Sequence, residues 1–327
     1  MKAETIRVDR LSAYKDESNV VFDSTELNRR VMEHFEANQP EPTSFPAMAS
    51  RVIDLAEHPD VDISKLAHLI ERDPAICAAV LAVANSAVNR RGEPVQNIRM
   101  AMTRLGLKRV ANIAVGIACR SLFDVELRVQ YELFPKWWSR LFHASMTEAF
   151  TSSFVAMERM RNASEGIFLA GMLRNIGASL ALRSLASLIV SGNYPLVPGE
   201  SDIELLVRST RVTIGVKALM RLKLPENLVT ICQHQTASLV PHIPERFDIL
   251  VIQLVSSLNE LRMGTLDTTE PLRLLLSASQ ELKIDKNGTL EVAKQLMEHA
   301  AQVELLFSTT DDADETGYLE FIDRILG

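Results

Sequence analysis

The 327-residue chain contains few of the residues that interrupt helices or cross-link small domains. Thirteen glycines and thirteen prolines are a small number for this length, which favours long helices over a turn-rich β fold. The three cysteines, Cys77, Cys119 and Cys232, are isolated and show no Cys-x-x-Cys spacing. This pattern speaks against a disulfide framework or a zinc site, and it predicts buried free thiols in a reducing cytoplasm.

Long apolar runs are also lacking. No stretch approaches about 18 uninterrupted apolar residues, so we expect no membrane span and a cytoplasmic protein. The N-terminus is followed by mixed charge rather than by the apolar run of a secretory signal. Glycine-rich nucleotide loops and a Gly-x-Ser-x-Gly nucleophile motif are absent from the sequence, and no cofactor is predicted.

The charge is negative overall but unevenly distributed. A net charge of −7 argues against general nucleic-acid binding. Between Arg90 and Arg120, however, Glu93 is the only acidic residue. The candidate basic docking face in this segment consists of Arg90, Arg91, Arg99, Arg104, Lys108 and Arg109. It could receive an acidic partner or a phosphate, or it could be a solvated helix face; the sequence leaves both interpretations open.

Helix-start and helix-end signals recur along the chain. Asp73 before Pro74 predicts a helix start, because the carboxylate caps free N–H groups and proline lacks the N–H that would be unpaired there. Asn97 predicts another start, Gly106 the end of that helix, and Pro135 the start of a long one. Period-2 alternation is nowhere sustained, so the sequence predicts an all-α fold.

Four segments are expected along the chain. Residues 1–24 read as a tail or cap, 25–125 as a first helical lobe, 126–245 as a second lobe and 246–327 as a C-terminal helical extension. In the extension, Asn287-Gly288 is expected to connect two helices, and an acidic loop is expected at 309–315. The chain then ends in an amphipathic helix whose apolar face carries Leu319, Ile322 and Leu326. This last helix packs on the core or detaches to bind a partner.

The segment Leu173-Arg174-Asn175-Ile176-Gly177 follows a helix of small residues. It resembles the central His-Asp-Ile-Gly motif of the HD superfamily of metal-dependent phosphohydrolases. Here Arg174 and Asn175 stand where that motif has its metal ligands. A guanidinium has no lone pair to donate, and a carboxamide is a poor substitute for a carboxylate that bridges divalent ions.

Further motifs narrow the resemblance. In order and spacing, four segments over about residues 40 to 240 are similar to the HDOD family, bacterial signalling proteins whose HD-like bundle lacks the usual ligands. These segments are Phe45-Pro46-Ala47-Met48, Ile70 to Ala75, Leu81 to Ala87, and Ile98 to Gly106. The resemblance implies a two-lobed helical bundle whose second lobe is like an HD phosphohydrolase.

The resemblance also implies where metal ligands would lie. HD enzymes bind one or two divalent ions through His and Asp residues, and those ions activate water for attack on phosphorus. The first of these positions matches His143. The remaining positions match Arg174, Asn175, Arg211, His234 and Gln235. Two imidazoles beside two guanidiniums cannot hold a divalent ion well, so we predict no metal and no catalytic site.

Three uses of these residues remain open from the sequence. The two histidines could be hydrogen-bonded between helices. Arg174 and Arg211 could instead form a vestigial anion pocket, whose other members would be His143, Asn175, His234 and Gln235. Arginine forks suit phosphate oxygens. Arg174 could also pair with a glutamate on a neighbouring helix.

The function predicted from these observations is a non-catalytic signal-transduction regulator or adaptor that acts through protein–protein contacts. Its partners would be other signalling proteins, and a homo-oligomer stays open. One alternative is a metal-free module that senses a nucleotide or phosphate. Another is a residual metal-dependent phosphohydrolase.

Overall fold

The computed structural model describes residues 24–38, 45–57, 60, 62–86, 92–123, 128–159, 166–195, 197–307, 313 and 315–327. Every regular element in these ranges is helical, which confirms the all-α prediction. The expected tail before residue 24, Arg90 and Arg91 of the basic face, and most of the acidic loop lie outside the described residues.

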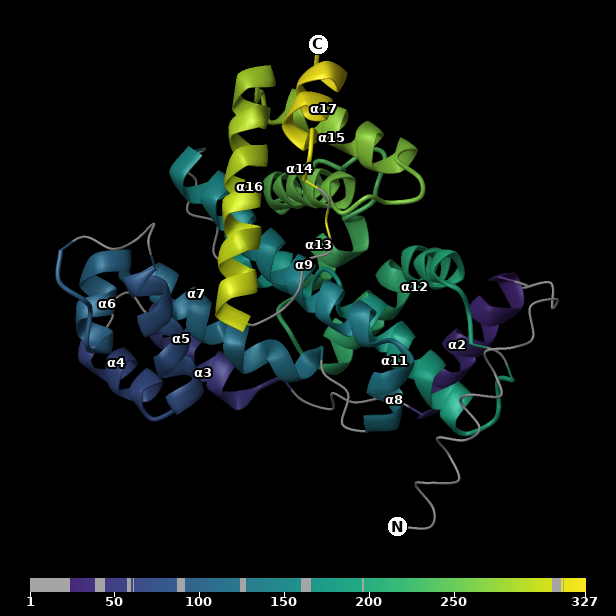
Figure 1. Ribbon diagram of the computed structural model, residues 1–327, viewed down its shortest axis with the longest axis horizontal. Coiled ribbons are helices and arrows are strands. Elements are labelled where there is room, and N and C mark those ends of the chain that lie inside the picture. Colours follow the sequence, from purple (N-terminus) through teal and green to yellow (C-terminus); the bar gives the residue numbers. More distant parts are fainter. Residues whose placement is uncertain are drawn as a thin grey trace.

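The first lobe is a group of short helices at one end of the molecule (Figure 1). Its helices are α3 (Ala47–Glu57), α4 (Ile63–Glu71), α5 (Pro74–Asn85), α6 (Ile98–Leu105) and α7 (Leu107–Ala118), followed by the short 3-10 turn η1 (Cys119–Leu122). The caps are those that the sequence predicts. Asp73 accepts hydrogen bonds from the N–H groups of Ala75 and Ile76 at 3.0 and 3.1 Å, and Asn97 caps α6. Gly106, at φ +85°, is both the C-cap of α6 and the N-cap of α7.

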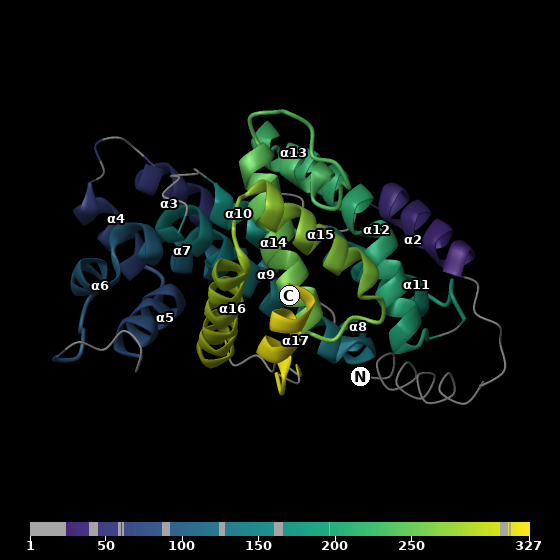
Figure 2. The same ribbon diagram turned by 90° about the horizontal axis from the view of Figure 1, so that it is seen from above.

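Helix α2 (Ser24–Asn38) does not pack with these helices. Its predicted apolar stripe of Leu27, Val31 and Phe35 is buried, but the helices it contacts are α11 and α12 of the second lobe. Figures 1 and 2 both place α2 at the opposite end of the molecule from α3–α7. The prediction of a first lobe over residues 25–125 is therefore wrong for its first helix, which packs on the second lobe. Periodicity identifies a buried face but not the surface that covers it.

The second lobe is arranged around a long central helix. It contains α8 (Arg128–Leu133), α9 (Pro135–Phe154), the π-helical turn η2 (Val155–Arg159), α10 (Ile167–Leu173), α11 (Ile176–Val190), α12 (Glu200–Arg221) and α13 (Glu226–His234). Helix α9 contacts α10, α14 and α16, and most of its own residues are buried. The segment Ile167–Val190 is apolar and long enough to cross a membrane, but 83% of its most apolar window is buried inside the protein. It is used here as core.

The C-terminal helices are not simply appended. They are α14 (Arg246–Arg262), α15 (Thr269–Glu281), α16 (Lys286–Phe307) and α17 (Tyr318–Ile325), and both α14 and α16 pack on α9. The sequence predicts that Asn287 and Gly288 connect two helices, but they lie in the first turn of α16. The side chain of Asp285 accepts a hydrogen bond from the Gly288 N–H at 2.8 Å and so caps the start of this helix. Helix α17 packs back on the core, with Ile322 buried.

The three cysteines are free thiols. Cys119 and Cys232 are buried as predicted, whereas Cys77 is only partly buried, on the apolar helix α5. Burial raises the pKa of Cys232 to about 11.

Candidate functional site: a buried ion network at Arg174 and Arg211

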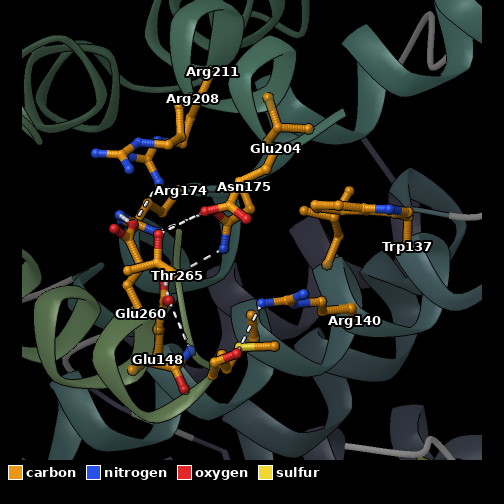
Figure 3. Close-up of a pocket in the computed structure, with 15 residues that line it drawn as sticks. Trp137, Arg140, Glu148, Arg174, Asn175, Glu204, Arg208, Arg211, Glu260 and Thr265 are labelled. Carbon is orange, nitrogen blue, oxygen red and sulfur yellow. Dashed lines mark hydrogen bonds and ion pairs between the residues drawn. The ribbon is translucent and has the colours of Figure 1, made fainter. Parts of the chain in front are cut away.

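Two glycines bring the sequence-predicted arginines together. Arg174 follows α10, Asn175 begins α11, and Arg211 lies in the middle of α12. A Cβ atom on Gly177 would lie 2.0 Å from the carbonyl oxygen of Arg211 and 2.5 Å from the nitrogen of Gly215. Only glycine permits this crossing of α11 and α12, and the crossing places both guanidinium groups against α9 and α14 (Figure 3).

Two glutamates hold these arginines. Nη1 of Arg174 lies 3.3 Å from Oε2 of Glu148 on α9, and Nη2 of Arg174 pairs with Glu260 on α14. Nη1 of Arg211 donates to the same Oε1 of Glu260 at 2.6 Å. The side chains of Arg174, Arg211 and Glu148 are each exposed by 7% or less, so the alternating chain Glu148–Arg174–Glu260–Arg211 is largely withdrawn from water.

Amide groups complete the network. Nδ2 of Asn259 donates to Glu148 at 2.9 Å, and Nδ2 of Asn175 lies 3.4 Å from the other oxygen of that carboxylate. The carbonyl oxygen of the Asn175 side chain accepts a hydrogen bond from Arg174 at 3.1 Å. A buried carboxylate is costly unless its lone pairs are satisfied. Here Glu148 has partners on both of its oxygens.

The electrostatics of the network follow from burial and pairing. Burial raises the pKa of Glu148, against the opposing effect of Arg174. Burial also opposes the charged form of Glu260, but Arg211 and Arg174 outweigh it and lower the pKa of Glu260 to about 2. Burial alone would lower the pKa of Arg174, and the charges of Glu148 and Glu260 raise it instead. The two guanidiniums are therefore balanced by carboxylates.

A small cavity of about 80 Å³ adjoins the network. Figure 3 shows Trp137 and Arg140 on one side of it and Glu204, Arg208 and Arg211 on the other. The groups at its rim are already engaged: Arg140 donates to the carbonyl of Met263, Arg208 to Glu270 and Thr265 to Glu204. This volume suits a few water molecules rather than a nucleotide, because ligand pockets measure roughly 300–1,000 Å³.

The other three predicted pocket residues lie elsewhere. Nε2 of His143 is 3.0 Å from the carbonyl oxygen of Ala300, so this histidine faces α16. The side-chain amide of Gln235 donates to the carbonyl of Cys232 at 3.0 Å, and the main-chain carbonyl of His234 accepts a hydrogen bond from Nε2 of Gln253 at 3.2 Å. None of His143, His234 and Gln235 lines the cavity at Arg174. The structure thus brings together three of the six residues of the predicted anion pocket.

The residues present do not fit the divalent ions of an HD enzyme. Among the described residues, no group of three or more His, Cys, Asp and Glu side chains is placed to hold a metal. The carboxylates nearest the former ligand positions, Glu148 and Glu260, are bonded to guanidinium groups. A metal would have to displace those cations, whose charges repel it.

Sequence reasoning missed Glu148, Asn259 and Glu260. A signal for Glu148 does exist in the sequence. It is the only charged residue between His143 and Phe154, within a helix whose residues from 141 to 153 are all buried. A lone charge in such a run requires a partner of opposite sign. Glu260 and Asn259 lie near the end of α14, where nothing in the local pattern separates a buried polar residue from an exposed one.

The predicted basic docking face is divided between different uses. Arg99 is exposed, whereas Arg104 donates to the carbonyl oxygens of Ala84 and Glu93 and so holds the loop before α6. Lys108 and Arg109 line a second cavity, of about 290 Å³, and Nη2 of Arg109 lies 3.2 Å from Oε1 of Gln302 on α16.

Comparisons with known proteins agree with this architecture. The helices define an all-α bundle with an HD-like fold. The sequence profile of the HDOD domain matches residues 43–238, and the chain belongs to the HDOD family. No match was found among curated proteins.

Solved structures show the same fold at low sequence identity. An HDOD domain protein of unknown function from Geobacter sulfurreducens is 19% identical, with a TM-score of 0.62 over 86% of this chain and 99% of that one. A proposed metal-dependent phosphohydrolase from Shewanella amazonensis is 20% identical, with a TM-score of 0.60 over 85% and 99%. A proposed signal transduction protein from Marinobacter aquaeolei is 19% identical, with a TM-score of 0.53 over 97% and 66%.

Proposed function

We propose that this HDOD protein is a non-catalytic signal-transduction module that acts through contacts with other proteins. The observation that carries the proposal is the pairing of Arg174 and Arg211 with Glu148 and Glu260. The HD resemblance places metal ligands at both arginines. Guanidinium groups cannot coordinate a metal ion, and their charges take the place of the positive charge that the ion would supply.

The signalling role is supported by the family match and by the likeness to the Marinobacter protein, which is described as acting in signal transduction. The net charge of −7 supports proteins rather than nucleic acids as partners. The free cysteines fit a reducing cytoplasm, and a second copy of the chain is one candidate partner. A phosphate sensor at Arg174 and Arg211 has less support, because both guanidiniums already contact carboxylates.

The loss of catalysis is tested with the purified full chain from cells grown with added manganese and iron. Bound metal is measured by plasma mass spectrometry, and hydrolysis of p-nitrophenyl phosphate and its bis ester is followed with Mn²⁺, Fe²⁺, Ni²⁺ and Mg²⁺. We expect far less than one metal ion per chain and no turnover above the metal-only background.

The matched variants are Glu148→Gln in the network and Glu281→Gln on the surface. Glu281 pairs with Arg246 at 2.8 Å and is 42% exposed. Metal-dependent turnover that Glu148→Gln abolishes and Glu281→Gln retains would overturn the proposal.

The protein-contact role is tested by affinity capture from lysate of the source cells, with cross-linking and the full chain as bait. We expect a discrete partner whose cross-links map to one face of the bundle. Capture no greater than on empty beads would contradict a role as an adaptor.

A further inference from the structure

The second cavity lies where the first lobe, the second lobe and the C-terminal helix α16 meet. The first lobe contributes the junction of α6 and α7, the second lobe the end of α9 and the π-helical turn η2, and α16 contributes His299. Figures 1 and 2 show α16 running beside α7 and α9, and the hydrogen bond from Arg109 to Gln302 joins α7 to α16. Its volume of about 290 Å³ is more than three times that of the cavity at the ion network.

One wall of this cavity is electropositive. Helix α7 begins at Gly106, and no side chain among the described residues caps it. The N–H groups of a first helical turn have no partner within the helix and carry the positive end of its dipole. Lys108 and Arg109 lie in that turn and line the cavity, whereas no aspartate or glutamate is among its described lining residues. Such a helix start is suited to an anion.

A second and independent observation comes from Ser153. Its side chain is only 9% exposed and lines the cavity, and its hydroxyl has no hydrogen-bond partner among the described residues. Buried hydroxyl groups are generally hydrogen-bonded, so one without a partner calls for a group that enters the cavity. Ser153 is on α9 and so belongs to a different lobe from the start of α7.

The remaining wall is aromatic and neutral. The ring of His299 lies 5.9 Å from that of Phe150 and 6.3 Å from that of Phe154, measured between centroids. Nδ1 of His299 contacts the hydroxyl of Thr151 at 3.0 Å. Burial and then the charge of Arg109 lower the pKa of His299 to about 3, so the imidazole is neutral near pH 7. Flat apolar rings of this kind accept an aromatic ligand face or edge.

We propose that the interlobe cavity binds a nucleoside 5′-monophosphate. The phosphate would lie at the first turn of α7 beside Lys108, and the base would lie against Phe150 and Phe154, within reach of the Ser153 hydroxyl. A volume of about 290 Å³ lies just below the roughly 300–1,000 Å³ of ligand pockets, which suits a mononucleotide better than a dinucleotide. The inference goes beyond the proposed function and does not depend on the loss of catalysis.

Isothermal titration calorimetry of the full chain tests the proposal. The probes are AMP, GMP, CMP and UMP, with adenosine and inorganic phosphate as separate arms. We expect at least one monophosphate to bind, and the nucleoside and free phosphate each to bind at least about tenfold more weakly, because each loses one wall of contacts. Stronger binding of inorganic phosphate than of every nucleotide would overturn the proposal that the base binds against Phe150 and Phe154.

Variants locate the binding. Lys108→Glu reverses one charge at the helix start, and Ser153→Val replaces the hydroxyl by a methyl group of similar size. Each is expected to weaken nucleotide binding about tenfold or more. The control is Lys136→Glu, an exposed lysine in the first turn of α9, which should leave binding unchanged. Circular dichroism checks that each variant is folded, and Lys108→Gln replaces Lys108→Glu if that variant is not.

Two results would overturn the proposal. One is the absence of a binding heat for all four nucleotides with the wild-type chain. The other is binding that is unchanged in folded Lys108→Glu or Lys108→Gln and in Ser153→Val, or that Lys136→Glu weakens equally.

Discussion

The cavity at Arg174 and Arg211 and the cavity between the lobes are both lined by basic side chains, and they differ in what those side chains contact. At the positions that the HD resemblance assigns to metal ligands, Arg174 and Arg211 are bonded to Glu148 and Glu260, and about 80 Å³ of space remains. Between the lobes, Lys108 and Arg109 line about 290 Å³ whose described lining residues include no carboxylate. The number of basic residues in a motif therefore does not by itself predict an anion-binding site. Whether carboxylates pack against those basic residues determines whether an anion can bind there.

The two cavities also differ in how their polar groups are satisfied. Glu148 has partners on both oxygens, and the carbonyl and amino groups of the Asn175 side chain both have partners. In the interlobe cavity the Ser153 hydroxyl has no partner among the described residues. The first region is expected to contribute to stability, and the second to contribute little until a ligand enters.

The largest effect is expected from Glu260→Ala. This change leaves Arg211 without the carboxylate that it contacts at 2.6 Å and leaves Arg174 with Glu148 as its one carboxylate partner among the described residues. Removing one partner of a buried ion pair costs about 3–5 kcal/mol. Urea denaturation at pH 7 measures the change. The control Glu281→Ala breaks an exposed pair with Arg246 and should cost at most about 1 kcal/mol. Equal losses of stability in the two variants would show that the buried network stabilises the fold no more than an exposed ion pair does.

The pH dependence of the free energy of unfolding tests the same ion network. The pKa of Glu260 is about 2 in the folded protein and near 4.5 when the chain is unfolded. Its contribution is therefore present above about pH 4.5 and is lost as the pH falls from there toward 2. Between pH 5 and 3 the wild type should lose about 2 kcal/mol more than Glu260→Gln does. Parallel pH profiles from urea denaturation would show that Glu260 is not held charged by the arginines.

The helix crossing beneath the network is tested with Gly177→Ala. The added methyl group would meet the Arg211 carbonyl oxygen at 2.0 Å, so α11 and α12 must move apart. Overpacking of this kind costs about 1–3 kcal/mol. Gly199→Ala is the control, because its nearest neighbour is a flexible carboxylate oxygen at 3.5 Å. Thermal unfolding measures both, and a Gly177→Ala protein as stable as Gly199→Ala would contradict the close approach.

The smallest effect is expected in the interlobe cavity. Ser153→Ala removes a hydroxyl that has no partner among the described residues, so the free energy of unfolding should change by less than about 0.5 kcal/mol. Asn259→Ala removes an amide that donates to buried Glu148 at 2.9 Å and should cost about 1–3 kcal/mol. Chemical denaturation without ligand compares them. A larger loss of stability in Ser153→Ala than in Asn259→Ala would show that the Ser153 hydroxyl, and not the Asn259 amide, makes the stabilising hydrogen bond.

Much of the fold could be predicted because its signals are local. Asp73, Asn97 and Pro135 mark helix starts through groups within three residues of the cap, and the stripe of Leu27, Val31 and Phe35 follows from the helical period. The position of α2 on α11 and α12 could not be predicted in this way, because it depends on which distant surface matches the stripe. The placement of Asn287 depends likewise on a cap by Asp285 that defines where α16 begins.

The candidate site was predicted only in part for the same reason. Alignment with the HD motif identified Arg174 and Arg211, and the glycine-mediated crossing brings them together. Their partner Glu260 lies 86 residues from Arg174 and belongs to a segment outside the family match. His143 and His234 are equally prominent in the motif, yet neither lines the cavity at Arg174, and Nε2 of His143 contacts the carbonyl oxygen of Ala300 on α16 instead. Long-range pairing of charges leaves no periodic pattern in the sequence.

The most direct test of the account is a double-mutant cycle between Arg211 and Glu260. Arg211→Met, Glu260→Gln and the double variant are each unfolded with urea at pH 7. If the guanidinium and carboxylate stabilise one another in place of a metal, each single variant is strongly destabilised and the coupling energy is about 1.5 kcal/mol or more. A coupling below about 0.5 kcal/mol, within the additivity expected of independent sites, would contradict it.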